Sequence, residues 1–353
     1  MGRVIRRVRQ HCCQSELTGG LVAALQHRKD IQMKKVVVYK PLPEETIEYL
    51  RSHAQVTIVD PKQPGALIEA LKDADGAIGT GAKMNAETLA DASRLKVLST
   101  VSVGFDAFDV DYLNKRGILL TNTPDVLTES TADTAFSLVL LTARRLAELA
   151  AFVKAGKWTK KIGEDRFGVD VHHKTLGIVG LGRIGTSVAR RAALGFLMNV
   201  LYVDQGVNEK AEREYGAKKV SLDELLKTSD FVLLQAPLTP ETRNLISTPQ
   251  LQAMKRSAFL INASRGPIVD EPALVKALQV GVIAGAGLDV YQEEPLSVES
   301  PLLKMENVVT LPHIGSATHE TRQAMNKNAA ENLIEALNGT LKANMVNPQV
   351  LKH

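Results

Sequence analysis

A glycine-rich stretch near the middle of the 353-residue chain limits the folds that this sequence can adopt. Residues 176–179 form a short apolar run, and Gly180, Gly182 and Gly185 then give the pattern G-x-G-x-x-G before a helix-forming segment. This order predicts a strand, a tight turn and a helix. In such a unit the first glycine makes the turn, the second admits a close ligand and the third lets the helix pack on the strand. The free N–H groups at the start of the helix are suited to phosphate.

An acidic residue at the end of the next predicted strand makes this interpretation more specific. Asp204 follows the apolar run 200–203 and lies 19 residues after Gly185. A carboxylate at about this spacing binds the adenosine ribose in dinucleotide-binding units. The pattern therefore predicts a nicotinamide dinucleotide site, and Asp204 favours NADH because it would repel the 2′-phosphate of NADPH. A simple tight loop and a strand-end turn residue are the alternatives.

Composition and charge restrict the class of protein. A chain of 353 residues is long for one core and predicts two domains. The formal net charge of +4 is carried by residues 1–32, so the remainder is neutral in sum and we expect no nucleic-acid partner. The most apolar stretch, residues 135–153, is interrupted by charged residues, so we expect no membrane span.

Residues 1–32 are interpreted as a dispensable leader ahead of a natural start at Met33, where a clean strand begins. This segment is rich in arginine and poor in acids, so a targeting segment or a specific arm are alternatives. Both cysteines, Cys12 and Cys13, lie in it. The rest of the chain therefore has no disulfide or cysteine-based metal site, which favours a cytoplasmic location.

Strands and helices alternate from residue 35 onward, which is typical of parallel sheets covered by helices. In the first part, strands are expected at 35–39, 56–60, 76–79, 96–100 and 118–121, and helices at 43–52, 64–73, 85–92 and 109–115. A single long helix is expected over 128–155. After Asp204, strands are expected at 230–235, 258–262, 284–290 and 308–311, with helices at 271–279 and 318–337.

The predicted fold class is therefore α/β with two doubly wound parallel-sheet domains. Residues 129–317 would form a dinucleotide-binding domain of the Rossmann type. It would be inserted into a flavodoxin-like substrate domain made of residues 33–128 and 318–353.

Predicted strand-end loops carry polar groups that a core would not bury, namely Arg265, Glu294 and His313. The planar guanidinium of Arg265 is suited to hold a substrate carboxylate and polarise a carbonyl oxygen. Backbone N–H groups at Val103 and Gly104 would hold the other side of the carboxylate.

His313 would donate a proton to the carbonyl oxygen as a hydride reaches the carbon. Glu294 would bond the far ring nitrogen and favour the imidazolium. Reduction should then weaken, and oxidation strengthen, as the pH rises through the titration of the imidazole. Alone, each side chain has an ordinary alternative as a solvated loop residue, and spacing along the chain cannot bring the three together.

Four motifs in order resemble the D-isomer-specific 2-hydroxyacid dehydrogenases: GLGRIG at 180–185, NASRGPIVD at 262–270, GLDVYQEEP at 287–295 and PHIGSAT at 312–318. The resemblance covers essentially residue 33 to the end. It implies that Arg265, Glu294 and His313 are catalytic. Beside the pattern glycines Gly180, Gly182 and Gly185, it implies cofactor contacts at Arg183, Ile184, Asp204, Pro237, Thr242, Ala263, Asp289 and Gly315. We expect no metal, because the pair His172–His173 has no cysteine partner nearby and is interpreted as a loop pair.

Further stretches at 99–106, 171–177 and 313–322 resemble the branch of that family that reduces glyoxylate, hydroxypyruvate and 2-ketogluconate. The resemblance implies reduction of small 2-oxo acids to D-2-hydroxy acids with NADH or NADPH. That branch generally favours NADPH and commonly has arginine just after the position of Asp204, where this chain has Gln205. We therefore expect NADH to be used at least as well. Family members are commonly homodimers, so 128–155 is the expected interface.

Two other functions fit the same patterns. Relatives of this fold act as nucleotide-sensing corepressors, although here the arginine, glutamate and histidine positions are all filled. A dehydrogenase for another small anion, such as phosphite, also remains open. The preferred 2-oxo acid and the physiological direction are left open by the sequence.

Overall fold

The computed structural model describes residues 33–352, and they divide into two compact units. Unit 1 contains the described residues up to Ser99, then 109–121 and those from 330 onward, and unit 2 contains 100–108 and 122–329. The leader predicted at 1–32 lies outside the described residues. The domain limits given above remain a prediction.

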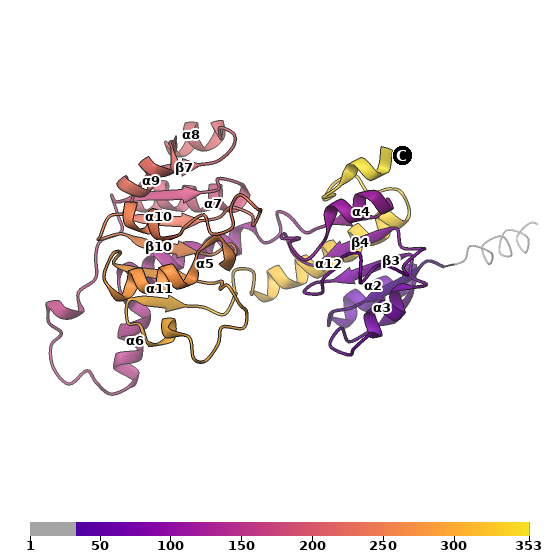
Figure 1. Ribbon diagram of the computed structural model, residues 1–353, viewed down its shortest axis with the longest axis horizontal. Coiled ribbons are helices and arrows are strands. Elements are labelled where there is room, and N and C mark those ends of the chain that lie inside the picture. The colour runs from indigo at the N-terminus through magenta and orange to yellow at the C-terminus, as the bar shows by residue number, and fades with distance from the viewer. Residues whose placement is uncertain (1–32, 353) are drawn as a thin grey trace, which may run out of the picture. The chain divides into compact units, whose positions relative to one another are not determined.

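Unit 1 is built on a five-stranded sheet in the order β2-β1-β3-β4-β5 (Figure 1). Its strands are β1 (Lys35–Val38), β2 (Gln55–Ile58), β3 (Gly76–Gly79), β4 (Val97–Thr100) and β5 (Leu119–Thr121), and its helices are α2 (Glu44–His53), α3 (Ala66–Leu71) and α4 (Val110–Arg116). The pairs β1–β2, β1–β3 and β4–β5 are parallel. Hydrophobic residues of β1, β3 and β4 are almost completely buried, which explains their near-continuous apolar sequences.

The C-terminal segment completes unit 1 next to β5. The side chain of Asn347 is fully buried. Its Oδ1 accepts a hydrogen bond from Leu120 N at 2.7 Å, and its Nδ2 donates to Asn114 Oδ1 and Ile118 O at 2.9 and 3.0 Å. Because a buried amide must find partners for all its polar atoms, this residue fixes the last turn of the chain against the sheet edge.

The helix expected over residues 85–92 is wrong, since the segment is a run of turns. One helix-like bond, from Leu89 N to Asn85 O at 3.0 Å, is present. The guanidinium of Arg116 instead donates to Leu89 O at 3.0 Å and to Ala92 O at 2.9 Å. A distant side chain therefore satisfies carbonyl groups that a helix would satisfy internally.

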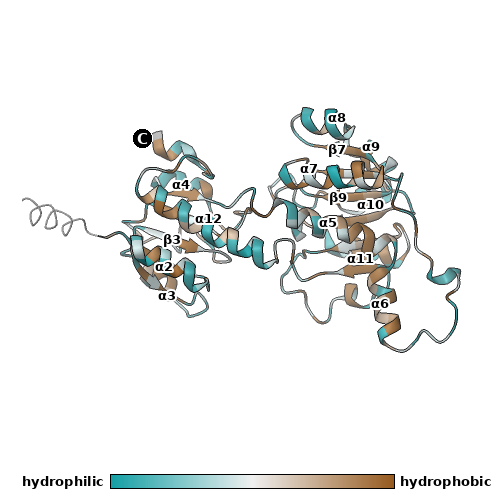
Figure 2. Cartoon of the chain, turned by 180° about the vertical axis from the view of Figure 1, so that it is seen from behind, coloured by the Kyte–Doolittle hydropathy of each residue, from teal (hydrophilic) through white to brown (hydrophobic). Residues whose placement is uncertain are grey.

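Unit 2 contains a seven-stranded sheet in the order β12-β11-β10-β9-β6-β7-β8, with every neighbouring pair parallel. Its strands are β6 (Thr175–Val179), β7 (Asn199–Val203), β8 (Lys218–Lys219), β9 (Phe231–Leu234), β10 (Phe259–Asn262), β11 (Gly285–Leu288) and β12 (Val308–Thr310). Figure 2 shows the apolar strands inside and the hydrophilic sides of the helices facing outward.

Helices cover this second sheet in two groups, each with its own apolar core. They are α5 (Thr128–Ala143), α6 (Leu146–Lys154), α7 (Arg183–Arg190), α8 (Glu209–Tyr215), α9 (Leu222–Thr228), α10 (Thr248–Ala253) and α11 (Glu271–Gln279), and α12 (His319–Leu337) is divided between the two units. Short helical turns are η1 (Glu164–Arg166), η2 (Arg191–Gly195), η3 (Gly266–Ile268), η4 (Pro301–Lys304) and η5 (Pro348–Lys352). Two parallel-sheet α/β units agree with the predicted fold class.

The single helix expected over 128–155 is also wrong, because the chain breaks between α5 and α6. Arg145 has a φ of +53°, in the left-handed region that ends a helix. Its guanidinium then bonds Glu148 of α6 at 2.7 and 2.8 Å. The carbonyl of Ala143 accepts from Val169 N at 2.8 Å, so a returning segment satisfies the end of α5.

Candidate active site

The sequence-predicted site residues of unit 2 follow the carboxyl ends of its strands. Because the strands are parallel, these ends lie at one edge of the sheet, where ligands bind in open α/β sheets. In chain order the residues are Gly180 after β6, Asp204 after β7, Pro237 after β9, Ala263 and Arg265 after β10, Asp289 and Glu294 after β11, and His313 and Gly315 after β12.

The glycine-rich turn has the geometry of a phosphate cradle. Gly180 has a φ of +97°, and a Cβ there would lie 2.6 Å from Ala236 N. A Cβ on Gly185 would lie 2.3 Å from Gly180 O, so helix α7 can approach β6 only because this residue is glycine. A Cβ on Gly182 would meet no atom within 4 Å. The protein does not itself fill this space, which fits a pyrophosphate over the start of α7.

Asp204 is held next to this turn by backbone groups. One carboxylate oxygen accepts from Leu181 N at 2.7 Å, and the other accepts from Gln205 N at 2.7 Å. Asn208 Nδ2 donates to Leu181 O at 3.0 Å, so both backbone polar groups of Leu181 are bonded to the segment after β7. The carboxylate is therefore fixed at the strand end where the adenosine ribose of a dinucleotide would lie.

The other predicted cofactor residues lie on the same edge, and their contacts with a dinucleotide remain a prediction. Arg183 is exposed and its Nε pairs with Asp125 at 2.5 Å. Thr242 Oγ1 donates to Pro237 O at 2.7 Å, which closes the loop after β9. Ile184 is half-buried in α7, and Ala263 is buried.

Asp289 organises the loop that contains His313. Its side chain is almost completely buried, and its two oxygens accept from Ile314 N at 2.7 Å and from Gly315 N at 2.9 Å. Burial raises the pKa of this carboxyl above its usual range, despite these two hydrogen bonds. The loop also holds His313 at a φ of +54°, a conformation uncommon for a residue other than glycine.

His313 and Glu294 form a direct pair, with Nδ1 and Oε2 separated by 2.7 Å. The hydrogen bond expected from the sequence is thus present. Tyr291 N donates to the other oxygen of Glu294 at 3.1 Å, and Tyr291 Oη donates to Leu311 O at 2.8 Å. Burial raises the pKa of the Glu294 carboxyl, but the hydrogen bond from His313, the backbone N–H and the charge of Arg265 outweigh it, so this pKa lies below its usual range.

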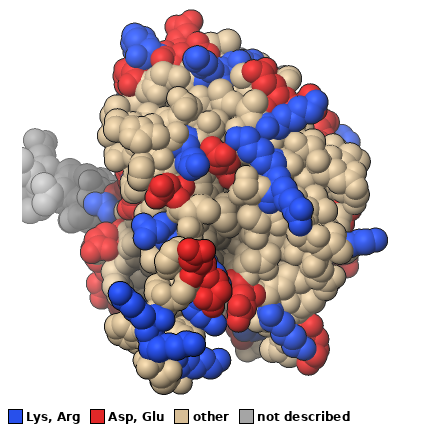
Figure 3. Space-filling model, turned by 90° about the vertical axis from the view of Figure 1, so that its left-hand side faces the viewer, with Lys and Arg blue, Asp and Glu red and all other residues tan. Residues whose placement is uncertain are grey.

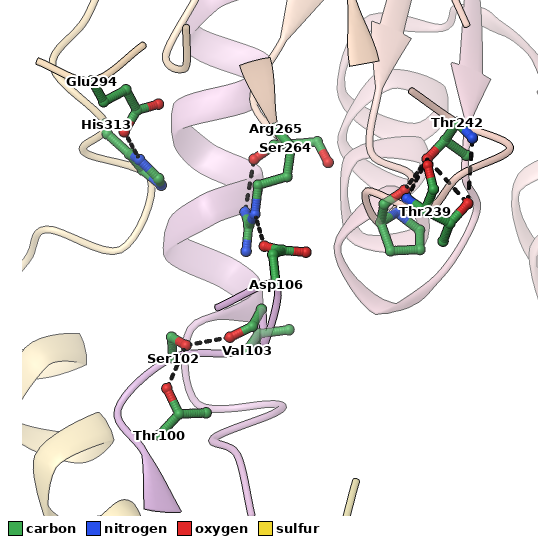
Figure 4. Close-up of polar contacts among 12 residues, drawn as sticks. Thr100, Ser102, Val103, Asp106, Thr239, Thr242, Ser264, Arg265, Glu294 and His313 are labelled. Carbon is green, nitrogen blue, oxygen red and sulfur yellow. Dashed lines mark hydrogen bonds and ion pairs between the residues drawn. The ribbon is translucent and has the colours of Figure 1, made fainter. Parts of the chain in front are cut away.

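Arg265 lies against the loop that follows β4. Its Nε donates to Asp106 Oδ2 at 2.5 Å and its Nη1 donates to Ser264 O at 2.8 Å (Figure 4). A Cβ on Gly104 would lie 1.5 Å from Nη2, so the guanidinium packs directly on this glycine. The structure therefore brings Arg265 and the predicted substrate loop together. Sequence reasoning missed Asp106, although this carboxylate stands two residues after Gly104.

Metal sites and membrane spans can be assessed over residues 33–352. Within that range there is no cluster of three histidine, cysteine, aspartate or glutamate side chains that could hold a metal ion. In the same range no helix combines the length and apolarity needed to cross a membrane.

Comparison with known proteins finds similar sequences over most of the chain. The family model for the D-isomer specific 2-hydroxyacid dehydrogenase, NAD binding domain, matches residues 136–315. The chain is 54% identical over 320 residues to glyoxylate/hydroxypyruvate reductase B of Serratia proteamaculans (strain 568), covering 90% of this chain and 98% of that protein. It is 53% identical over 321 residues to the protein of the same name from Yersinia enterocolitica, with the same coverage.

Solved structures are also similar over most of the chain. A protein from Thermus thermophilus is 41% identical with a TM-score of 0.81, over 88% of this chain and 99% of that one. An NADPH-dependent glyoxylate/hydroxypyruvate reductase from Sinorhizobium meliloti, solved with NADP and malonate, is 31% identical with a TM-score of 0.81, over 89% and 97%.

Proposed function

The chain belongs to the D-isomer-specific 2-hydroxyacid dehydrogenase family, and we propose from this that it reduces glyoxylate to glycolate and hydroxypyruvate to D-glycerate with a nicotinamide cofactor. The observation that carries the proposal is the His313–Glu294 pair at the same sheet edge as the glycine-rich turn. Reduction of 2-ketogluconate to gluconate is proposed as a further activity of the same site.

The cofactor would bind along the edge formed by the glycine-rich turn and Asp204. When bound, it supplies the hydride that reaches the carbonyl carbon. The open space at Gly182 and the fixed carboxylate of Asp204 are suited to a pyrophosphate and a ribose with a free 2′-hydroxyl. We therefore propose that NADH is used at least as well as NADPH, unlike the relative from Sinorhizobium meliloti that is described as NADPH-dependent.

Each of the three polar side chains has a distinct role in the proposed reaction. Arg265 would hold the substrate carboxylate with the part of its guanidinium not bonded to Asp106 or Ser264, and backbone N–H groups of Val103 and Gly104 would hold its other side. Because Nδ1 of His313 faces Glu294, Nε2 is the ring nitrogen left to protonate the carbonyl oxygen. Glu294, ionised through its lowered pKa, would favour the imidazolium that gives this proton.

We also propose a homodimer formed through the region 128–155, with α6 and the segment that follows it as the most exposed part. None of the residues of α6 is buried. Leu146, Val153, Trp158 and Phe167 are 46%, 50%, 63% and 58% exposed. Several exposed large apolar residues in one segment of the chain favour an interface there. The region is also held in shape, because Glu148 accepts hydrogen bonds from Arg145 and from Arg166 at 2.8 and 2.9 Å.

The absence of nucleic-acid and membrane partners, and a cytoplasmic location, remain predictions from composition. Figure 3 shows one face of the molecule, on which basic and acidic side chains are interspersed. The face shown there does not carry the basic footprint that nucleic-acid binding needs.

The test is a turnover assay with the purified full chain, following nicotinamide absorbance. NADH and NADPH would each be offered with glyoxylate, hydroxypyruvate, 2-ketogluconate and pyruvate. Turnover of the hydroxylated substrates or glyoxylate supports the proposal. NADH binding without any turnover would contradict it and favour a nucleotide sensor. A parallel assay with phosphite and NAD⁺ or NADP⁺ tests the other dehydrogenase reaction, which cofactor reduction there, without turnover of any 2-oxo acid, would favour.

A further inference from the structure

Arg265 is held by hydrogen bonds at two nitrogens of its guanidinium. A guanidinium carries five N–H donors in a fixed planar fork. Nε is bonded to Asp106 at 2.5 Å, and Nη1 donates to the carbonyl of Ser264 at 2.8 Å. Nη2 lies over Gly104, at the place where a Cβ would stand on any other residue. These contacts define the plane of the guanidinium. The remaining N–H donors, on Nη1 and Nη2, therefore have fixed directions.

The loop that carries Asp106 is itself fixed. Ser102 Oγ donates to Gly104 O at 2.5 Å and is within 2.9 Å of Thr100 Oγ1. Asn122 Nδ2 donates to Val103 O at 2.9 Å. Asp106 is thus a carboxylate on a rigid support, 159 residues away in sequence from the arginine that it contacts. Both side chains are about one-third exposed, at 34% for Asp106 and 30% for Arg265.

We propose that Asp106 is a positioning residue for Arg265, acting as the hydrogen-bond acceptor that sets the orientation of the guanidinium toward the 2-oxo acid. This proposal rests on the proposed function, because it assigns Arg265 to the substrate carboxylate. Arginine has a long, flexible side chain, and a guanidinium bonded at Nε presents its Nη edge to a carboxylate in a bidentate arrangement. The hydrogen-bond acceptor that Asp106 offers to Nε, rather than its negative charge, sets the orientation of the Arg265 guanidinium.

Paired substitutions separate the acceptor from the charge. Asp106→Asn keeps an oxygen for Nε but removes the charge, whereas Asp106→Ala removes both. We expect Asp106→Ala to lower kcat/KM for glyoxylate about 10- to 100-fold, the scale of loss when a reacting group is misplaced. Asp106→Asn should stay within about threefold of the unmodified enzyme, with a KM that is equal or lower because one negative charge near the anionic substrate is gone. Asp111→Ala, an exposed aspartate five positions later, is the matched control.

NADH binding keeps this test independent of folding and of the proposed function. The dissociation constant and stoichiometry for NADH, and the melting temperature, should be the same in all four proteins, so that a loss confined to substrate turnover reports the orientation of Arg265. Turnover by Asp106→Ala within threefold of the unmodified enzyme would overturn the proposal. An equal loss in Asp106→Asn and Asp106→Ala would also overturn it, because the charge would then be what matters. Failure of the unmodified enzyme to reduce any 2-oxo acid would instead reject the proposed function.

Discussion

Replacing Asp204 should change the choice between NADH and NADPH. The carboxylate is held by Leu181 N and Gln205 N, so it cannot turn away from a 2′-phosphate at low cost. Two unit charges 4 Å apart repel by about 1 kcal/mol in bulk water and about 4 kcal/mol near a protein surface. Because Asp204 is only half-buried, we take the repulsion between its carboxylate and a 2′-phosphate as about 1.4 to 2.8 kcal/mol. This energy corresponds to roughly a 10- to 100-fold change in the preference for NADH over NADPH.

Two variants divide this effect into its parts. Asp204→Asn removes the charge but leaves an amide oxygen that can accept from Leu181 N, so it isolates the electrostatic contribution. Asp204→Ala also removes the acceptor that holds the glycine-rich turn and the group that would bond the ribose of NADH. We therefore expect Asp204→Asn to gain activity with NADPH, and Asp204→Ala to lose activity with NADH as well.

The assay is the ratio of kcat/KM for NADPH to kcat/KM for NADH, measured at saturating glyoxylate and low ionic strength. Asp223→Asn, which removes an exposed carboxylate on α9, serves as the control for a general change in charge. An unchanged ratio in both Asp204 variants would show that this carboxylate does not select the cofactor. A ratio that rises in Asp204→Ala but not in Asp204→Asn would refute the electrostatic part alone.

Three further predictions test the acid–base pair and the fold. Replacing His313 by Gln should lower the rate of reduction by roughly 10²–10⁴ in kcat, with NADH binding intact, and near-normal turnover would reject its role as the acid. Because the pKa of Glu294 lies below its usual range, the carboxylate is ionised at neutral pH and supports the imidazolium, so Glu294→Gln should move the alkaline fall of the reduction rate to lower pH. A pH profile that keeps its position would contradict this. Asn347→Ala leaves Leu120 N without its acceptor, so thermal unfolding should show a loss of about 1–3 kcal/mol, and an unchanged melting temperature would contradict the structural role.

Local sequence patterns predicted most of the strands and helices because each pattern acts over only a few residues. The apolar run and glycines at 176–185 needed no distant partner, and the observed β6 and α7 follow them. Predictions failed where a distant group satisfies the backbone. Arg116 bonds carbonyls of the segment expected to be a helix at 85–92, and Val169 caps the break after α5.

Chain order and residue chemistry were sufficient to predict the fold class, the glycine-rich turn and the types of side chain that stand at strand ends. They could not predict which of those side chains meet, because that depends on how distant segments pack. The register of the parallel strands places Glu294 at hydrogen-bond distance from His313, 19 residues later. The pairing of Arg265 with Asp106 depends on a loop from a much earlier part of the chain lying on this edge, and no local pattern encodes a contact between segments so far apart.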